Sequence, residues 1–263
     1  RKKTMTIVTV KSDATPVCAA HSRSARCENC AARNLFLCSH LDEKELALLG
    51  SVARTMEFGK GDMLFEQDAQ LRHVFLITSG YVKLYYELAN GIRQIIGFLG
   101  TGDIIGGVKR HAAAYSTAEA LTDVSVCTFD REIFLDLLSR NSRLSFVMFV
   151  IATDEIEAHN DHLILLRRKG APERLATFLL MFAARLRRLD RDAIALELPM
   201  SRTDIADHLG LTVESVSRAF TSLRGRGFIR TPRRDKVHLV NLPALHAIAG
   251  IEDLPERAVS LGF

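Results

Sequence analysis

Four of the five cysteines in this chain lie close together in the N-terminal part of the sequence. They are Cys18, Cys27, Cys30 and Cys38, whereas Cys127 lies far downstream. The N-terminal stretch is basic but has no sustained apolar segment, which predicts a cytoplasmic protein without a secretory signal. Structural disulfides are rare in the cytoplasm, and clustered thiolates bind metals or undergo redox reactions. The cysteines therefore predict a metal-binding or redox-active segment.

Composition limits the classes of protein to consider. The chain has 263 residues, a hydrophobic fraction of 48%, a net charge of +4 and a pI near 8.9. Its length fits one large or two ordinary domains, and its mild basicity permits nucleic acid as a partner. The longest apolar runs, such as Phe146–Ala152, are too short to span a bilayer, so no membrane association is expected. No P-loop, nucleophile elbow or HExxH motif is present, and we expect no enzymatic activity.

Short apolar stretches separated by glycine-containing turns fill the first half of the chain. Asn90-Gly91 is a strong β-hairpin signal. The expected strands are Arg54–Phe58, Met63–Phe65, His73–Thr78, Tyr81–Leu88, Ile92–Leu99, Thr117–Leu121 and Val124–Phe129. Short strands at this spacing predict an antiparallel roll or barrel.

A long helix is predicted at Arg143–Arg168, which contains neither glycine nor proline. One stripe at alternating spacings of three and four consists of Phe149, Ala152, Ile156, His159, Leu163 and Leu166. The other consists of Met148, Ile151, Glu155, Ala158, His162 and Leu165. Two such stripes predict that the helix packs on its own domain and, through the first stripe, on a second copy in a dimer. The alternative is a core helix buried on all sides.

Two helices joined by a tight turn are predicted near the C-terminal end. Ser201 begins a helix that ends at Leu209, Gly210 breaks it, and Thr212 caps a second helix, Val213–Arg224. This pattern is typical of a helix-turn-helix, whose second helix enters the major groove of double-stranded DNA. A plain helical hairpin with a solvated basic face is the alternative.

The second helix presents side chains suited to reading bases. Glu214, Ser217 and Arg218 should point outward, where arginine recognises guanine and glutamate accepts from cytosine. Phe228–Arg230 and Val237–Val240 are expected to form a β-wing. The basic side chains expected near phosphates are Arg224, Arg226, Arg230, Arg233, Arg234 and Lys236.

These motifs resemble the CRP/FNR superfamily of bacterial transcription regulators, and most closely its FNR branch, which includes the FnrN and FixK types. Thr212–Arg218 is similar to the FNR recognition helix, whose Glu, Ser and Arg read TTGAT half-sites. Val213 stands where cAMP-receptor proteins carry an extra Arg. Asp161–Ala176 resembles the end of the FNR dimer helix and the hinge that follows. The resemblance implies a homodimer, a palindromic DNA site and contact with RNA polymerase.

The predicted roll resembles a cyclic-nucleotide-binding domain. In cAMP receptors an Arg-Ser pair holds the cyclic phosphate, and here Tyr115-Ser116-Thr117-Ala118 takes its place. A buried phosphate without its arginine would be poorly held. We therefore expect no cyclic nucleotide.

The resemblance also implies a role for the cysteines. Cys27, Cys30 and Cys38, together with Cys127 at a position similar to that of the distant FNR ligand, would hold a [4Fe–4S] cluster. Seven residues separate Cys30 from Cys38, where several FNR proteins have five, a spacing that resembles rhizobial relatives. Cys18 is outside the pattern and is expected to be a free thiol. The alternatives are a structural Zn²⁺ site and a Cys127 that is simply a small buried residue.

These observations predict an α+β fold with an N-terminal antiparallel β-roll, a long dimerisation helix and a C-terminal winged helix-turn-helix. The expected divisions are a flexible arm with the cysteine segment at 1–40, the roll at 41–140, the long helix at 141–169, the DNA-binding domain at 170–250 and a tail at 251–263. The predicted function is oxygen-responsive transcription regulation by an iron–sulfur homodimer on TTGAT-type palindromes. The alternative is a constitutive or zinc-stabilised regulator of the same family without a cluster.

Overall fold

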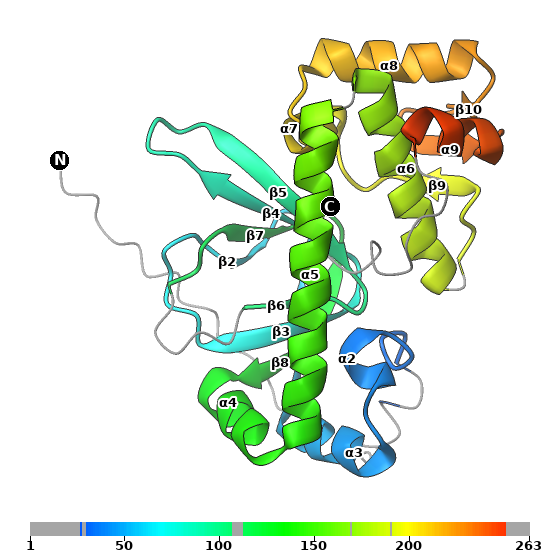
Figure 1. Ribbon diagram of the computed structural model, residues 1–263. Coiled ribbons are helices and arrows are strands. Elements are labelled where there is room, and N and C mark those ends of the chain that lie inside the picture. Colours follow the sequence, from blue (N-terminus) through cyan, green and yellow to red (C-terminus); the bar gives the residue numbers. More distant parts are fainter. Residues whose placement is uncertain (1–26, 28–29, 107–112, 169, 190, 251–263) are drawn as a thin grey trace.

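The computed structural model describes residues 27, 30–106, 113–168, 170–189 and 191–250. The expectations for Cys18 and for the terminal segments lie outside these residues. Figure 1 shows a β-roll, a long helix running along it, and a helical domain at one end of that helix. The elements are α2 (Phe36–Ser39), α3 (Glu43–Val52), β1 (Arg54–Phe58), β2 (Met63–Phe65), β3 (His73–Ser79), β4 (Tyr81–Glu87), β5 (Arg93–Gly100), β6 (Ile104–Ile105), β7 (Thr117–Ala120), β8 (Val124–Asp130), α4 (Arg131–Arg140), α5 (Ser142–Arg168), α6 (Ala171–Arg188), β9 (Ala195–Glu197), α7 (Arg202–His208), α8 (Val213–Gly225), β10 (Ile229–Arg230), β11 (Lys236–Leu239) and α9 (Leu242–Ala249).

The roll consists of two antiparallel four-stranded sheets, ordered β1-β8-β3-β6 and β2-β7-β4-β5. The tight turn between β3 and β4 requires Gly80, whose φ is +88° and where a Cβ atom would lie 2.3 Å from the carbonyl oxygen of Asp123. Apolar residues from both sheets form one buried core, among them Val74, Leu76, Val82 and Val126. The predicted antiparallel roll is therefore confirmed.

Some short elements were not predicted from the sequence. They are β6, which has two residues, α2 with four, β9 with three, and α9 after the wing. The first three have only two to four residues, too few to show a hydrophobic period, so their formation depends on tertiary contacts. β9 is held in this way, because Val237 and His238 of β11 pair with it.

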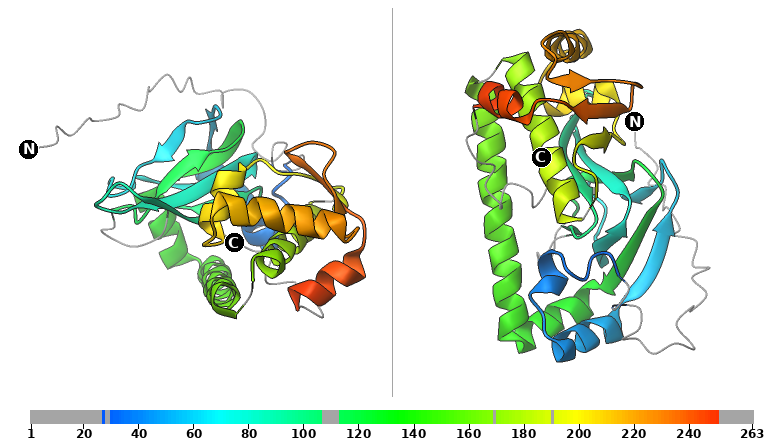
Figure 2. Two further views of the ribbon diagram at one scale, coloured as in Figure 1. Left: turned by 90° about the horizontal axis from the view of Figure 1, so that it is seen from above. Right: turned by 90° about the vertical axis from the view of Figure 1, so that its right-hand side faces the viewer.

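Helix α5 has one buried side and one exposed side. Ile151 and Ala158 of the second predicted stripe are buried against the protein's own domains. Phe149, Ile156 and Leu163 of the first stripe are 68%, 62% and 56% exposed. The views in Figure 2 show α5 at the edge of the molecule, with the other elements on one side of it. The prediction that the second stripe packs on the protein's own domains is therefore confirmed.

No described helix is long and apolar enough to cross a membrane.

The C-terminal domain shares a hydrophobic core with the roll. Phe98 of β5 packs edge-to-face on Phe178 of α6, with ring centroids 6.1 Å apart. An ion pair joins Asp103, in the turn after β5, to Arg185 of α6, and the two side chains are 0% and 4% exposed. Asp103 also accepts from the backbone N–H of Gly100 at 2.8 Å. The two domains are therefore joined by packing and by a buried pair of opposite charges.

We predict that replacing Arg185 with Met destabilises the protein strongly. The Asp103 carboxylate would stay buried without its cation, and the free energy of unfolding should fall by about 3–5 kcal/mol. The double variant D103N/R185M removes both charges and should recover part of that loss. Denaturant titrations of the wild type, both single variants and the double variant would give the coupling energy.

The exposed pair Arg140–Asp136, at 2.8 Å within α4, provides the matched control. Arg140→Met should change the free energy of unfolding by less than about 1 kcal/mol, because water screens this pair. Strictly additive effects of D103N and R185M would contradict the assignment of a coupled buried pair.

Candidate DNA interface and cysteine cluster

The two helices of the predicted helix-turn-helix are capped by their own side chains. At the start of α7, the Ser201 hydroxyl accepts from the Asp204 N–H at 3.0 Å, and Asp204 accepts from the Ser201 N–H at 2.8 Å. At the start of α8, Thr212 accepts from the Ser215 N–H at 3.1 Å. Gly210 takes φ +60° in the turn between them, a conformation that favours glycine. Ser201 and Thr212 therefore define where both helices begin.

Helix α8 divides sharply into a buried and an exposed face. Val216, Ala219 and Leu223 are buried against α7 and α6. Glu214, Ser217 and Arg218 are exposed on the opposite face, as the sequence predicted. In Figure 1, α8 lies across the end of the molecule, beyond α6 and α7. These three side chains are therefore placed where a DNA groove can reach them.

Two of the basic side chains in the wing form ion pairs within the protein. Arg233 donates to both carboxylate oxygens of Asp235, at 3.1 and 2.9 Å, and Lys236 forms an ion pair with Glu197 of β9. Arg234 and Arg226 are exposed. Phosphate contacts from the wing are thus better assigned to Arg234 than to Arg233.

Arg174 of α6 is a positioning residue that belongs to none of the predicted sites. Its guanidinium donates to the carbonyl oxygen of Leu166 in α5 at 2.6 Å and to that of Leu209 at the end of α7 at 2.7 Å. One side chain thereby joins the end of the long helix to the turn of the helix-turn-helix. The sequence shows an arginine near the start of a predicted helix, but its partners are backbone carbonyl oxygens, which a sequence does not identify.

Helix α7 is also attached directly to the roll. The Ile95 N–H of β5 donates to the Asp207 carboxylate at 2.9 Å, and the Gln94 side chain donates to the Asp207 carbonyl oxygen at 2.8 Å. Lys83 of β4 lies 3.5 Å from Asp204 and 3.1 Å from Glu119. The orientation of the helix-turn-helix is therefore fixed by strands of the roll.

The four predicted cysteine ligands come from two distant segments of the chain, and Cys27, Cys30 and Cys127 are near enough to Cys38 to act on its thiol electrostatically. Cys38 is in α2, Cys27 and Cys30 precede it, and Cys127 is in β8, where it pairs with Leu76 of β3 and Thr55 of β1. All four are reduced and half-buried. Burial raises the pKa of the Cys38 thiol to about 12, charge repulsion from Cys30, Cys127 and Cys27 adds to the rise, and Arg33 opposes it. Burial, followed by repulsion from Cys30, likewise raises the pKa of Cys27.

Four thiols of this kind fit an iron–sulfur cluster in ligand type and number. Among the residues that the structure describes, no three His, Cys, Asp or Glu side chains are already grouped to hold a single metal ion. The convergence of Cys127 with the N-terminal cysteines is the feature that spacing alone could not give, because it depends on the fold of the roll.

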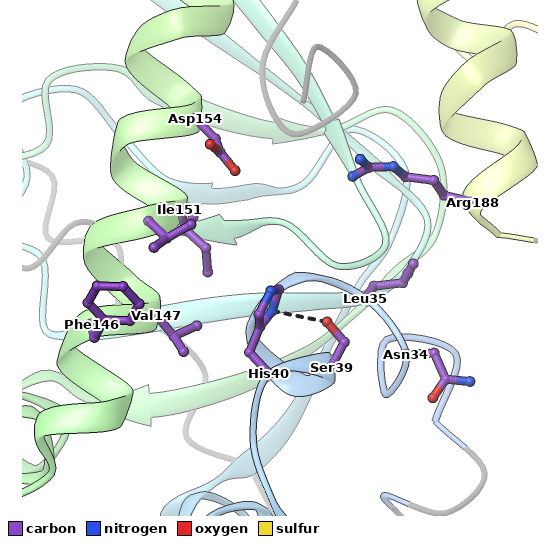
Figure 3. Close-up of a pocket in the computed structure, with 10 residues that line it drawn as sticks. Asn34, Leu35, Ser39, His40, Phe146, Val147, Ile151, Asp154 and Arg188 are labelled. Carbon is purple, nitrogen blue, oxygen red and sulfur yellow. Dashed lines mark hydrogen bonds between the residues drawn. The ribbon is translucent and has the colours of Figure 1, made fainter. Parts of the chain in front are cut away.

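A groove of about 410 Å³ separates the cysteine segment from the long helix. In Figure 3, Val147 and Ile151 of α5 lie opposite Ser39 and His40. Phe146, Leu35 and Arg188 also line the groove. The Ser39 hydroxyl and His40 Nδ1 are 3.1 Å apart. The cysteine segment thus borders apolar residues of α5 without filling the space beside them.

The expectation that the roll binds no cyclic nucleotide concerns a stretch that includes residues 107–112, which lie outside the described part of the chain. Of the residues that follow, Ser116 and Thr117 are buried, and Thr117 accepts from the Gln67 N–H at 3.0 Å. Tyr115 is 75% exposed and lies beside Tyr86, with ring centroids 5.3 Å apart.

Comparisons with known proteins identify both domains. Residues 173–248 match the family model of the Crp-like helix-turn-helix domain, and residues 55–141 match that of the cyclic nucleotide-binding domain. The nitrogen fixation regulation protein FixK of Bradyrhizobium diazoefficiens is 36% identical over 77% of this chain and 85% of its own length. The fumarate and nitrate reduction regulatory protein of Salmonella typhimurium is 32% identical over 89% of this chain and 92% of its own.

A solved structure supports the same assignment. FixK2 from Bradyrhizobium japonicum superimposes with a TM-score of 0.70 and 32% sequence identity, covering 78% of this chain and all of that one. The relatives are regulators of transcription and not enzymes, in agreement with the prediction from sequence. The chain therefore belongs to the CRP/FNR family of DNA-binding transcription regulators.

Proposed function

We propose that this protein is an oxygen-responsive cytoplasmic regulator, active as a homodimer that holds one [4Fe–4S] cluster in each protomer. The observation that supports the proposal is that Cys27, Cys30 and Cys127 all act on the Cys38 thiol, so the four thiols lie in one region of the molecule. Such a cluster, when bound, supplies iron–sulfur bonds that oxygen attacks. The protein contributes four thiols, which must lose their protons to become ligands.

The cysteine segment is linked to the long helix by polar contacts. Arg143, near the start of α5, donates to the His40 carbonyl oxygen at 3.3 Å and lies 3.5 Å from the Glu45 carboxylate. Ordering the segment around Cys38 therefore fixes the start of α5. A change in cysteine ligation would alter the population of α5 that is competent to dimerise.

The exposed stripe of α5 is the proposed dimer surface. A line of exposed large apolar side chains along one helix is uncommon in a soluble monomer, and such a surface usually marks an interaction site. A dimer through this stripe would present two copies of α8 to successive major grooves of a TTGAT-type palindrome. RNA polymerase is the further partner expected from family membership. The stripe consists of Phe149, Ala152, Ile156, His159 and Leu163, with half-buried Leu166 at its end.

Anaerobic purification tests the proposal directly. A brown protein that contains iron and sulfide and bleaches in air supports the cluster. A colourless protein that contains zinc, or no metal, and binds DNA equally well with and without oxygen supports the constitutive alternative and contradicts the proposal.

We predict that each of four cysteine substitutions abolishes cluster binding. Cys27→Ser, Cys30→Ser, Cys38→Ser and Cys127→Ser each remove one of four thiolates, and the anaerobic iron content and oxygen-dependent DNA binding should be lost. Cys18→Ser is the matched control and should behave as the wild type. An inactive Cys18→Ser combined with an active Cys38→Ser would overturn the ligand assignment.

We predict that Arg218 reads one guanine of each half-site. Arg218→Ala should cost about 1–3 kcal/mol on the intact site and remove discrimination at that base pair. Arg234→Ala should weaken binding to all sequences alike and reduce the salt dependence by about one phosphate contact. Binding assays with single-base variants of TTGAT at several salt concentrations measure both effects. An unchanged base preference in Arg218→Ala would contradict the assignment of Arg218 to a guanine.

We predict that His159 limits dimer formation in protein without a cluster. It is the only ionisable member of the exposed stripe, and its Nε2 lies 3.9 Å from Glu155. His159→Leu should strengthen self-association, and His159→Asp should weaken it, because two carboxylates would face each other across the two-fold axis. Sedimentation velocity at several protein concentrations measures the dimer constant. Asn160→Leu, an exposed neighbour outside the heptad register, is the control; equal strengthening by both leucine variants would mean that the seam follows another register.

A further inference from the structure

Two histidines stack on each other where the long helix meets the helix-turn-helix. His162 of α5 and His208, the last residue of α7, have ring centroids 4.5 Å apart and planes inclined by 26°. His208 is 2% exposed, and His162 is half-buried. Protonation of both rings would destabilise this stack, because two stacked imidazolium ions repel each other.

The rings around this pair come from the other two elements of the junction. The ring centroid of Phe98 in β5 lies 5.1 Å from that of His208, and the ring centroid of Phe178 in α6 lies 6.1 Å from it. His208 therefore contacts the roll, the long helix and α6 at once. A charge on its ring would have to be accommodated in largely apolar surroundings.

The neighbouring groups that act on the two rings through their charge are themselves basic. His159 of α5 and Arg174 of α6 oppose a further positive charge on His162, and His162 and His159 oppose one on His208. Asp207 of α7 accepts from the Ile95 N–H. Hydrogen bonds to the backbones of Ile95 and His208 oppose the lowering of the pKa of His208 and of His162, respectively, but burial is the larger effect for both rings. Glu155, also on α5, is near His159.

Burial and these neighbours lower the pKa of His162, and burial lowers that of His208 well below the usual value of 6.5. A histidine whose pKa is lower in the folded state contributes stability that is complete above pH 6.5. That stability is lost progressively as the pH falls below 6.5 toward the lowered pKa.

We propose that the His162–His208 stack makes the docking of the DNA-binding domain on the roll sensitive to acid. Protonation of the pair separates α7 from β5 and α5 and opens the Ile95–Asp207 hydrogen bond. Helix α8 moves with α7, because Val216 and Ala219 share a buried core with Ile205 and Ala206. The recognition helix is then no longer held in a fixed orientation. This response does not involve the cysteines.

Hydrogen exchange of the full-length, cluster-free protein tests the proposal. The Ile95 amide reports docking, because its N–H donates to Asp207 across the junction. Its protection, corrected for intrinsic exchange rates, should fall about tenfold between pH 7.5 and 5.5 for each proton that the docked state excludes. Strand β3, in the core of the roll, should keep its protection over the same range.

His162→Met and His208→Phe should each flatten this pH dependence, since an uncharged side chain of similar bulk replaces one ring. His238→Gln, in the wing, is the matched control and should respond to acid as the wild type does. If His208→Phe fails to fold, His162→Met alone decides the question. An identical loss of protection in wild type and His162→Met, or an equal loss in β3, would overturn the proposal. Because the readout needs neither DNA nor iron, it is independent of the oxygen-sensing proposal.

Discussion

The buried ion pair between Asp103 and Arg185 joins the roll to the DNA-binding domain, and the position of the recognition helix depends on it. Arg185 belongs to α6, which packs against α8 and α9. A buried charge pair tolerates little displacement, because separating the charges leaves each without solvent or partner. Lys83–Asp204 and the Ile95–Asp207 hydrogen bond add contacts from the roll to α7. A shift in β4 or β5 is therefore passed to the helix-turn-helix as a movement of a packed unit.

The features predicted from the sequence are those with local causes. Gly210, the capping residues Ser201 and Thr212, and the Asn90-Gly91 turn each fix backbone geometry within a few residues, so the helix-turn-helix and the hairpin could be identified. Asp103 and Arg185 could not be paired, because they are distant in sequence and their contact depends on how two domains dock. The pairing of Arg233 with Asp235 is local but was missed, since a count of basic residues ignores the carboxylate two positions away.

Helix α5 shows how a periodic pattern predicts a face but not its partner. Ile151 and Ala158 are buried while Ile156 and Leu163 are exposed, so the two stripes differ as their spacing indicated. Leu166 belongs by period to the exposed stripe, yet it packs on the core of the DNA-binding domain, because the helix there enters the junction with α6. Periodicity assigns residues to a side of a helix, whereas the docking of neighbouring domains decides where that side becomes buried.

The two ends of α5 are contacted by different groups. Arg143 near its start contacts the backbone of His40, close to Cys38, and Leu166 near its end accepts from Arg174, which also holds the turn of the helix-turn-helix. The helix has 27 residues, and a continuous helix of that length spans roughly 40 Å. A rigid helix cannot adjust one end independently of the other, so the contacts of Arg143 and Arg174 at its two ends constrain the same element.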